Sequence, residues 1–320
     1  MGEQVAQSLR EATVHGTVPP GAELPRTGRM SLGAVPQAFS LRRTARSHGW
    51  CGLAPSAYDD RAGALHRTLA LPDAGPLTVT VTQRSDGRLH ASWGRVSASS
   101  GDRQAIKQQC RHMLALDDDL TELHAGCAAL PGMEWVAETG VGRLLRSPTV
   151  FEDLARTLAT TNCSWSLTEL MCSRLVESLG AAGPAGERAF PTPPAVRDAG
   201  ERHLADVVRA GYRARSFVEL AAAVSDGTLD TASWWDPTVP DEEVLRQVRT
   251  LRGFGPYAAE GMLGLLGRPK GLALDSWIRA KLPRLLGRES MSDAEIADRY
   301  APLGRWAGVG LWLELTRDWF

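Results

Sequence analysis

The sequence lacks several features that would assign the protein to a common class. No stretch of eighteen apolar residues occurs, and residues 1–30 contain no apolar segment like that of a signal peptide. The histidines show no HxxxH or HExxH spacing, and neither a GxSxG motif nor a P-loop is present. We therefore expect no membrane span and no secretion, and we find no signature of a zinc protease, an α/β-hydrolase or a P-loop NTPase.

Cysteine is scarce, and its spacing is uninformative. The five cysteines form no CxxC pair and no four-cysteine cluster near the C-terminus, which excludes the usual patterns of zinc ribbons and iron–sulfur sites. Isolated cysteines of this kind are typical of reduced thiols in the cytosol. The expected location is a cytoplasm of bacterial type, in the cytosol or nucleoid.

Net charge is also small, at −1, but the average hides a local excess of cations. Between positions 245 and 288 the only acids are Glu260 and Asp275, whereas the cations are Arg246, Arg249, Arg252, Arg268, Lys270, Arg279, Lys281, Arg284 and Arg288. Such a surplus attracts polyanions such as nucleic acids. A solvated helical surface is the simpler alternative.

The hydrophobic pattern divides the 320-residue chain into three parts and predicts an α+β fold. Residues 1–34 are rich in proline, glycine and polar residues and are predicted to form a flexible tail. Residues 35–115 are predicted to form an N-terminal antiparallel sheet domain. Its clearest signal is "TVTVTQRSDGRLHASW", in which Asp86-Gly87 is typical of a hairpin turn, and "AFSLRRTARSHGW" is also predicted to be a strand.

Helical periodicity begins after residue 102 and continues to the C-terminus, so residues 116–320 are predicted to form an all-helical domain. The segment "SPTVFEDLARTLATTNCSWSLTELMCSRLVESLG" reads as two helices broken near "TTNCSW". Further helices are predicted in "VRDAGERHLADVVRAG", "RARSFVELAAAV" and "VPDEEVLRQVRTL".

Two helices joined by a glycine-containing turn are predicted around "LRGFGPY". Gly253 and Gly255 can adopt conformations closed to other residues, and they let a phosphate approach the main chain. Pro256 suits the first position of the second helix, whose free N–H groups can hold a phosphate oxygen. Phe254 would pack inward. A helix-hairpin-helix of this kind grips the backbone of a nucleic acid and reads no sequence.

A single carboxylate, Asp275, follows the hairpin within the apolar run "GLALDSWIRAKL". Burial of a carboxylate is costly, so such a position favours a functional role. The structural alternative is an N-cap for the next helix, and Asp275 can serve as both.

Several segments of the chain, taken together, resemble those of a known family. "LRGFGPYAAEGML…LALDSW" is similar to the hairpin, glycine/proline-rich loop and catalytic aspartate of the helix-hairpin-helix (HhH-GPD) DNA glycosylase superfamily. "SPTVFEDLARTLATTN" resembles a helix of its 8-oxoguanine and alkyladenine branches. "AGYRARSF" resembles a segment of the 8-oxoguanine branch, and "RHMLALDDDLTEL" one of the alkyladenine branch. The resemblance covers residues 35–320.

The resemblance assigns roles to four residues. Asp275 would stabilise the cationic sugar as the glycosidic bond breaks and help orient the attacking water. Asn162 would fill the gap left by the flipped nucleotide, Tyr212 would wedge the stack beside the opposite base, and Arg213 would hydrogen-bond that orphaned base. The residues alone favour a structural role for each of the last three: Asn162 as a helix cap, Tyr212 as a core residue and Arg213 as a surface residue.

The resemblance also implies features of the hairpin. Main-chain carbonyls matching Arg249, Leu251 and Phe254 would bind a monovalent cation, K⁺ or Na⁺, and no other cofactor is implied. Bifunctional members of the family carry a Schiff-base lysine at the position that Tyr257 occupies here. A phenol forms no imine, which predicts a monofunctional glycosylase that lacks AP lyase activity.

The base pocket departs from the 8-oxoguanine branch. Leu311 and Leu315 stand in place of a glutamine and a phenylalanine, Trp277 replaces a histidine, and Leu167 replaces a second arginine that reads the orphaned cytosine. An aromatic, apolar pocket suits electron-poor alkylated purines. Its predicted lining comprises Tyr257, Trp277, Trp306, Leu311 and Trp312, although tryptophans in a C-terminal helix are often core residues.

Together these features predict a DNA glycosylase of base excision repair that acts on an alkylated purine such as 3-methyladenine in double-stranded DNA. The protein is expected to be a monomer without a membrane partner. Two alternatives remain at this stage: an 8-oxoguanine-type glycosylase, and a non-catalytic DNA-binding module that senses damage.

Overall fold

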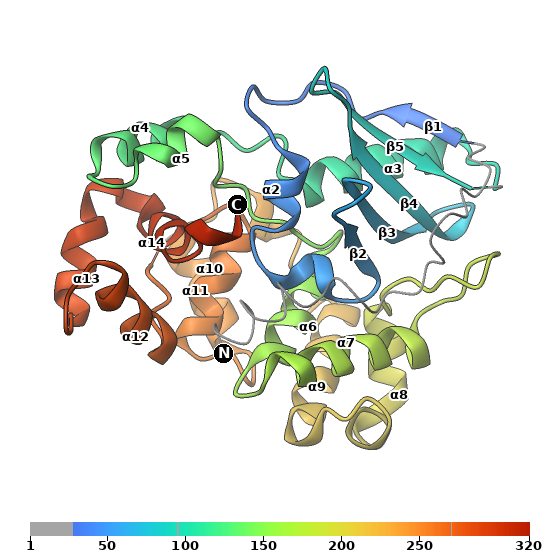
Figure 1. The fold of residues 1–320 in the computed structure, drawn as a ribbon. Coiled ribbons are helices and arrows are strands. Elements are labelled where there is room, and N and C mark those ends of the chain that lie inside the picture. The colour runs from blue at the N-terminus through green and yellow to red at the C-terminus, as the bar shows by residue number, and fades with distance from the viewer. Residues whose placement is uncertain (1–27, 95, 270) are drawn as a thin grey trace.

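The computed structural model describes residues 28–94, 96–269 and 271–320. Its N-terminal part is a five-stranded antiparallel sheet with the strand order β1-β5-β4-β3-β2. Figure 1 shows this sheet on one side of the molecule, with the helical part beside and below it. The strands are β1 (Gly28–Ser31), β2 (Ser56–Asp59), β3 (Ala64–Leu71), β4 (Gly75–Gln83) and β5 (Leu89–Trp93).

The hairpin predicted at Asp86-Gly87 is confirmed. It joins β4 to β5, with Val79 opposite Trp93 and Val81 opposite Ala91, and these four side chains are buried. Gly87 has a φ of +81°, a backbone conformation that glycine adopts at no steric cost. Alternation of apolar and polar residues therefore identified the centre of the sheet correctly.

The N-terminal edge of the domain differs from the prediction. "AFSLRRTARSHGW" is not a strand: it contains helix α2 (Leu41–Ala45), capped by the Ser40 hydroxyl, and the 3₁₀-helix η1 (Gly49–Gly52). The apolar residues of this segment are spaced so irregularly that they fit the two-residue period of a strand and the 3.6-residue period of a helix equally well. Strand β1 lies inside the segment that was predicted to be a flexible tail. Pairing with β5 stabilises this edge strand. Its four residues are too few for a hydrophobic pattern to be recognised in the sequence. The rest of that tail, residues 1–27, lies outside the described residues.

The predicted change to helices is confirmed. A break at residues 161–164 separates α6 from α7, as predicted near "TTNCSW". In the part of the chain that the structure describes, none of the helices combines the length and hydropathy needed to cross a bilayer. The larger helices are α3 (Ser100–Met113), α4 (Thr121–Ala129), α5 (Glu134–Thr139), α6 (Val150–Thr160), α7 (Trp165–Leu179), α8 (Pro193–Asp206), α9 (Ala214–Ser225), α10 (Asp241–Thr250), α11 (Pro256–Leu265), α12 (Ser276–Leu285), α13 (Asp293–Tyr300) and α14 (Ala307–Leu315).

Buried side chains form two clusters that do not follow the predicted division at residue 115. The larger cluster joins the sheet to α3 and to helices α6 through α11, while the smaller joins α4 and α5 to α12, α13 and α14. Figure 1 shows the second group as a separate helical lobe, in which the green α4 and α5 lie over the red C-terminal helices. The chain thus leaves this lobe after α5 and returns to it at α12.

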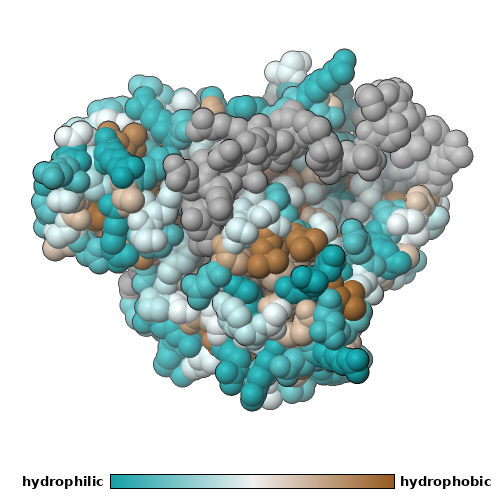
Figure 2. Space-filling model, turned by 60° about the horizontal axis from the view of Figure 1, so that its bottom comes forward, coloured by the Kyte–Doolittle hydropathy of each residue, from teal (hydrophilic) through white to brown (hydrophobic). Residues whose placement is uncertain are grey.

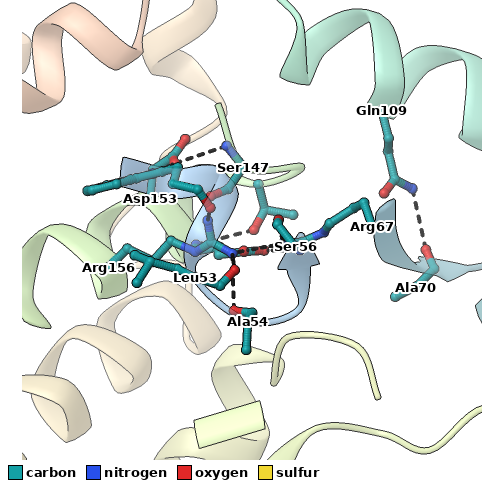
Figure 3. Close-up of polar contacts among 12 residues, drawn as sticks. Leu53, Ala54, Ser56, Arg67, Ala70, Gln109, Ser147, Asp153 and Arg156 are labelled. Atoms are coloured by element: carbon teal, nitrogen blue, oxygen red, sulfur yellow. Dashed lines mark hydrogen bonds and ion pairs between the residues drawn. The ribbon is translucent and has the colours of Figure 1, made fainter. Parts of the chain in front are cut away.

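A buried ionic network fastens the sheet to helix α6. Glu152 accepts two hydrogen bonds from Arg67 of β3, at 2.8 and 2.5 Å, and pairs with Arg156 at 2.7 Å. Arg156 in turn donates to the carbonyls of Leu53 and Ala54, at 3.1 Å each (Figure 3). Since buried charges are tolerated only when paired, this network fixes α6 against the N-terminal domain.

Candidate active site

The hairpin between α10 and α11 is held against α6. Gly253 has a φ of +94°, and a Cβ on it would lie 2.6 Å from Leu158 Cδ1, so only glycine fits this close approach. Phe254 is 5% exposed and belongs to the larger cluster, which confirms that it packs inward. The hairpin therefore has one fixed position relative to the end of α6.

Gly255 plays a different part from Gly253. Its φ of −76° and ψ of 179° are open to any residue, and a Cβ there would meet no atom within 4 Å. Gly255 is the N-cap of α11, with Pro256 at the first helical position as predicted. The absence of a side chain leaves the first turn of α11 open, and its free N–H groups can hold an anion.

Asp275 is the N-cap of α12. Its Oδ1 accepts the N–H of Ile278 at 2.8 Å, and the residue is half-buried. The capping role considered from the sequence is thus confirmed. One carboxylate oxygen makes the cap, and the second is left for chemistry.

The loop before Asp275 is tied from two sides. Glu260 of α11 accepts the N–H of Ala273 at 2.7 Å. Gly308 of α14 lies so close that a Cβ on it would be 2.1 Å from the Gly271 carbonyl oxygen. Sequence reasoning missed both contacts, because a lone glutamate and a glycine carry no signal of a partner from another helix. These two contacts hold the loop of Asp275 at the place where the larger and the smaller cluster of buried side chains meet.

Tyr257 lies beside Asp275. It is 36% exposed, yet burial raises the pKa of its hydroxyl above the ordinary value, and the negative charge of Asp275 raises it further. The phenol is therefore protonated at neutral pH. Tyr257, at the position where the resemblance places a Schiff-base lysine, is thus close enough to Asp275 for the carboxylate charge to act on its hydroxyl.

Asn162 and Tyr212 lie on neighbouring turns. Asn162 is exposed and has a φ of +47° directly after α6, the left-handed conformation that asparagine tolerates at a helix C-terminus. Tyr212 is 71% exposed on the 3₁₀-helix η2 (Gly211–Arg213) and is therefore not a core residue. Arg213 links the two turns, since its guanidinium donates to the Thr161 carbonyl with Nε at 2.9 Å.

Contrary to the surface position considered from the sequence, Arg213 is buried, at 4% exposure.

Figure 2 brings forward the lower side of Figure 1, where α6 to α9 lie. That side is mostly hydrophilic, with one hydrophobic patch near its centre.

The local cation surplus is largely paired in the structure. Arg252 and Arg215 share Glu219, at 2.7 Å each, and Arg249 lies 3.5 Å from Glu260. Arg268 donates to three main-chain carbonyls and to Asp241, so it fixes a loop. Lys270 lies outside the described residues. Other partners in this region are Arg246 with Glu243, Arg279 with Asp293, Lys281 with Asp318 and Arg288 with Glu295.

The predicted base-pocket residues separate into two groups. Trp277 and Trp312 lie together, with ring centroids 6.2 Å apart, and Trp319 packs on Trp312 at 5.5 Å. Trp306 and Leu311 instead are buried in the smaller cluster, and the Trp306 indole donates to Glu122 of α4 at 3.3 Å. Those two residues are therefore core, and Trp306 lies against α4.

Trp319 was missed at the sequence level. Its indole N–H is buried and has no hydrogen-bond partner among the residues that the structure describes. A cavity of about 580 Å³ opens elsewhere, and no predicted site residue lines it; its lining comprises Leu130, Leu286, Arg288, Met291, Glu295, Asp298 and Arg299.

The hairpin turn bears on the predicted cation. The Leu251 carbonyl accepts the N–H of Phe254 at 3.1 Å, and a carbonyl oxygen has a second lone pair for an ion. Among the described residues, no group of three or more His, Cys, Asp or Glu side chains is arranged to hold a metal. A monovalent ion on the carbonyls of Arg249, Leu251 and Phe254 stays a prediction.

The arrangement of a five-stranded antiparallel sheet followed by a helical part is also the fold of solved DNA glycosylases. Two solved structures with this fold are a 3-methyladenine DNA glycosylase from Archaeoglobus fulgidus and the apo form of an 8-oxoguanine glycosylase/lyase from Clostridium acetobutylicum. The first has a TM-score of 0.65 at 20% identity over 91% of this chain and 98% of its own. The second has a TM-score of 0.68 at 18% identity over 87% and 93%.

The C. acetobutylicum protein bound to DNA with cytosine opposite 8-oxoguanine gives a TM-score of 0.67 at 17% identity, over 92% of this chain and 99% of its own. No protein-family model and no curated protein sequence matches the chain significantly. At these identities the likeness establishes the fold, and the activity has to be argued from the site.

Proposed function

We propose that the protein is a DNA N-glycosylase of base excision repair. It hydrolyses the N-glycosidic bond of a damaged purine flipped out of double-stranded DNA. The observation that carries this proposal is the position of Asp275: a half-buried carboxylate beside Tyr257, on a loop fastened by Glu260 to the helix of the hairpin. A glycosylase needs a fixed anion within reach of a nucleotide that is gripped by its backbone.

The geometry supports a dissociative reaction. As the bond to the base breaks, positive charge develops on the sugar, and a preorganised carboxylate stabilises it better than water does. The N-cap hydrogen bond from Ile278 holds the Asp275 carboxylate in place. The base leaves with the electrons of the glycosidic bond, water then adds to the cationic sugar and releases a proton to solvent, and the product is an abasic site.

The chemistry at position 257 supports hydrolysis without strand cleavage. Tyr257 lies within reach of the Asp275 charge, but a phenol forms no imine with the sugar, so the covalent step of an AP lyase has no amine at this position. We therefore propose a monofunctional enzyme. Borohydride trapping of a protein–DNA adduct would contradict this part of the proposal.

The aromatic residues near the site favour an alkylated purine. Trp277 and Trp312 are partly exposed with ring centroids 6.2 Å apart, and the Lys281 ammonium lies 5.0 Å from the centroid of the Trp277 ring. Aromatic rings that attract a cation in this way also suit a base that carries positive charge, as 3-methyladenine does. An 8-oxoguanine is neutral and is read through hydrogen bonds, which fits an apolar pocket less well. A non-catalytic DNA-binding module would need Asp275 only as the N-cap of α12, a role that Asp275→Asn would keep.

Binding to duplex DNA would use two surfaces. The open first turn of α11 holds a phosphate, aided by a monovalent cation on the hairpin carbonyls, while Asn162 and Tyr212 enter the stack. The protein would act as a monomer, since all of these groups belong to one chain.

The test is a panel of duplex oligonucleotides that each carry one lesion, followed by alkaline cleavage of abasic sites. We expect release of alkylated purines by the wild type. Asp275→Asn keeps a side-chain cap for α12, so it should unfold at the wild-type temperature yet lose at least 100-fold in single-turnover rate. Asp275→Ala should lose both activity and about 1 kcal/mol of stability. Absence of excision on every lesion, or equal rates for Asp275→Asn and wild type, would refute the proposal.

A further inference from the structure

Arg213 occupies a position that does not suit a reader of bases. Its Nε donates to the Thr161 carbonyl at 2.9 Å, and its Nη2 donates to the same oxygen. The guanidinium also lies over the Tyr212 ring, 4.5 Å from the centroid. With the residue 4% exposed, reaching a base in the stack would require breaking these contacts.

These contacts fasten the turn that carries Asn162. Thr161 is the C-cap of α6, and Asn162 follows it with a φ of +47°. A cation that donates to the last carbonyls of a helix is favourable there, because those carbonyls lack partners and carry partial negative charge. Arg213 therefore stabilises the strained conformation that presents the Asn162 side chain to solvent.

Neither Leu167 nor Arg215, which lie on the helices that follow the two turns, takes over the reading of the opposite base. Leu167, on the first turn of α7, is apolar and partly buried against the larger cluster. Arg215 is paired with Glu219 at 2.7 Å. Discrimination between bases requires donors and acceptors aimed at a base edge.

We propose that Arg213 is a positioning residue that acts through Asn162, and that the protein does not discriminate the base opposite its lesion. This inference rests on the proposed function, because it assumes that the protein binds DNA at a lesion. Its test measures binding and does not require catalysis.

The test measures affinity for duplexes that contain a tetrahydrofuran abasic-site analogue opposite A, C, G or T, by fluorescence anisotropy. We expect the wild type to bind all four within threefold. Arg213→Ala should weaken binding to all four by one common factor, roughly 5- to 20-fold. Arg213→Lys should behave like Arg213→Ala, because an ammonium makes a point contact in place of the guanidinium's two bonds.

A double-mutant cycle separates positioning from a general structural effect. If Arg213 acts through Asn162, then Asn162→Gly should weaken binding in the wild type and have little further effect in Arg213→Ala. Arg209→Ala, a loss of one exposed cation four residues earlier, is the matched control and should show the wild-type profile. Thermal unfolding confirms that each variant is folded.

Three outcomes would overturn the inference: a tenfold or larger preference of the wild type for one opposite base, wild-type binding by Arg213→Ala, or additive effects in the cycle. Failure of the proposed function is a separate result, namely absence of excision on the lesion panel.

Discussion

The Glu260 carboxylate of α11 accepts the N–H of Ala273 at 2.7 Å, two residues before Asp275. Ala273 has a φ of +46°, an uncommon conformation for a residue with a side chain. Glu260 also lies 3.5 Å from Arg249 of α10. One carboxylate thus connects the helices of the hairpin to the loop that carries the candidate catalytic group.

Replacing Glu260 should lower the rate of the chemical step more than the affinity for DNA. Glu260→Ala removes the acceptor that holds the loop, which is worth about 1–3 kcal/mol, so we expect a 10- to 100-fold lower single-turnover rate. Glu260→Gln keeps a carbonyl acceptor and should lose less. Glu243→Ala, which removes a partly exposed carboxylate from α10, is the control. Equal rates for Glu260→Ala and wild type would show that the loop is fixed by other contacts.

The two hairpin glycines should respond differently to alanine. Gly253→Ala forces a Cβ onto a φ of +94° and to within 2.6 Å of Leu158, so we expect a loss of about 1–3 kcal/mol in stability. Gly255→Ala meets no atom within 4 Å and has an ordinary φ, so stability should be unchanged while DNA binding weakens. Thermal unfolding and anisotropy measure the two effects. Unchanged binding by Gly255→Ala would argue against a phosphate at this turn.

The buried network between sheet and helix should dominate stability. Glu152→Ala leaves Arg67 and Arg156 buried without their carboxylate, which costs about 3–5 kcal/mol. The exposed pair of Arg246 and Glu243 is worth at most about 1 kcal/mol, so Glu243→Ala serves as the comparison. Denaturant unfolding gives both numbers. Similar losses for the two variants would contradict the assigned role of the network.

Stability should depend on pH through His112. Burial lowers the pKa of this histidine from 6.5 to about 4, and the nearby charge of Arg146 adds to the effect. Since the folded pKa is depressed, the unfolded state binds more protons between pH 6.5 and 4, and stability falls as the pH falls through that window.

His112→Phe keeps an aromatic ring for the edge contact with Trp235, whose centroid is 4.7 Å away, but it does not titrate. The variant should lose less stability than the wild type on acidification from pH 7 to 4, by an amount of the order of 1–3 kcal/mol. Chemical denaturation at a series of pH values provides the measurement. Parallel stability curves for the two proteins would exclude His112 as a source of the acid sensitivity.

Local patterns in the sequence determined much of the fold. Alternation located the β4–β5 hairpin, and helical periodicity located the break before Asn162. Glycine and proline placed the hairpin and the start of α11, while Asp275 stood where a cap is needed. Each of these features depends on residues within one or two turns of chain, so it can be read without knowing what covers the element.

Partners from distant parts of the chain were decided only by the tertiary structure. The sequence could not show that Arg213 is buried against Thr161, or that Trp306 faces α4 while Trp312 donates to the Ser47 carbonyl, 265 positions away. Periodicity identifies the face of a helix that is buried, but not the element that buries it. For this protein the sequence supplied the chemical groups of the site, and packing decided which of them meet.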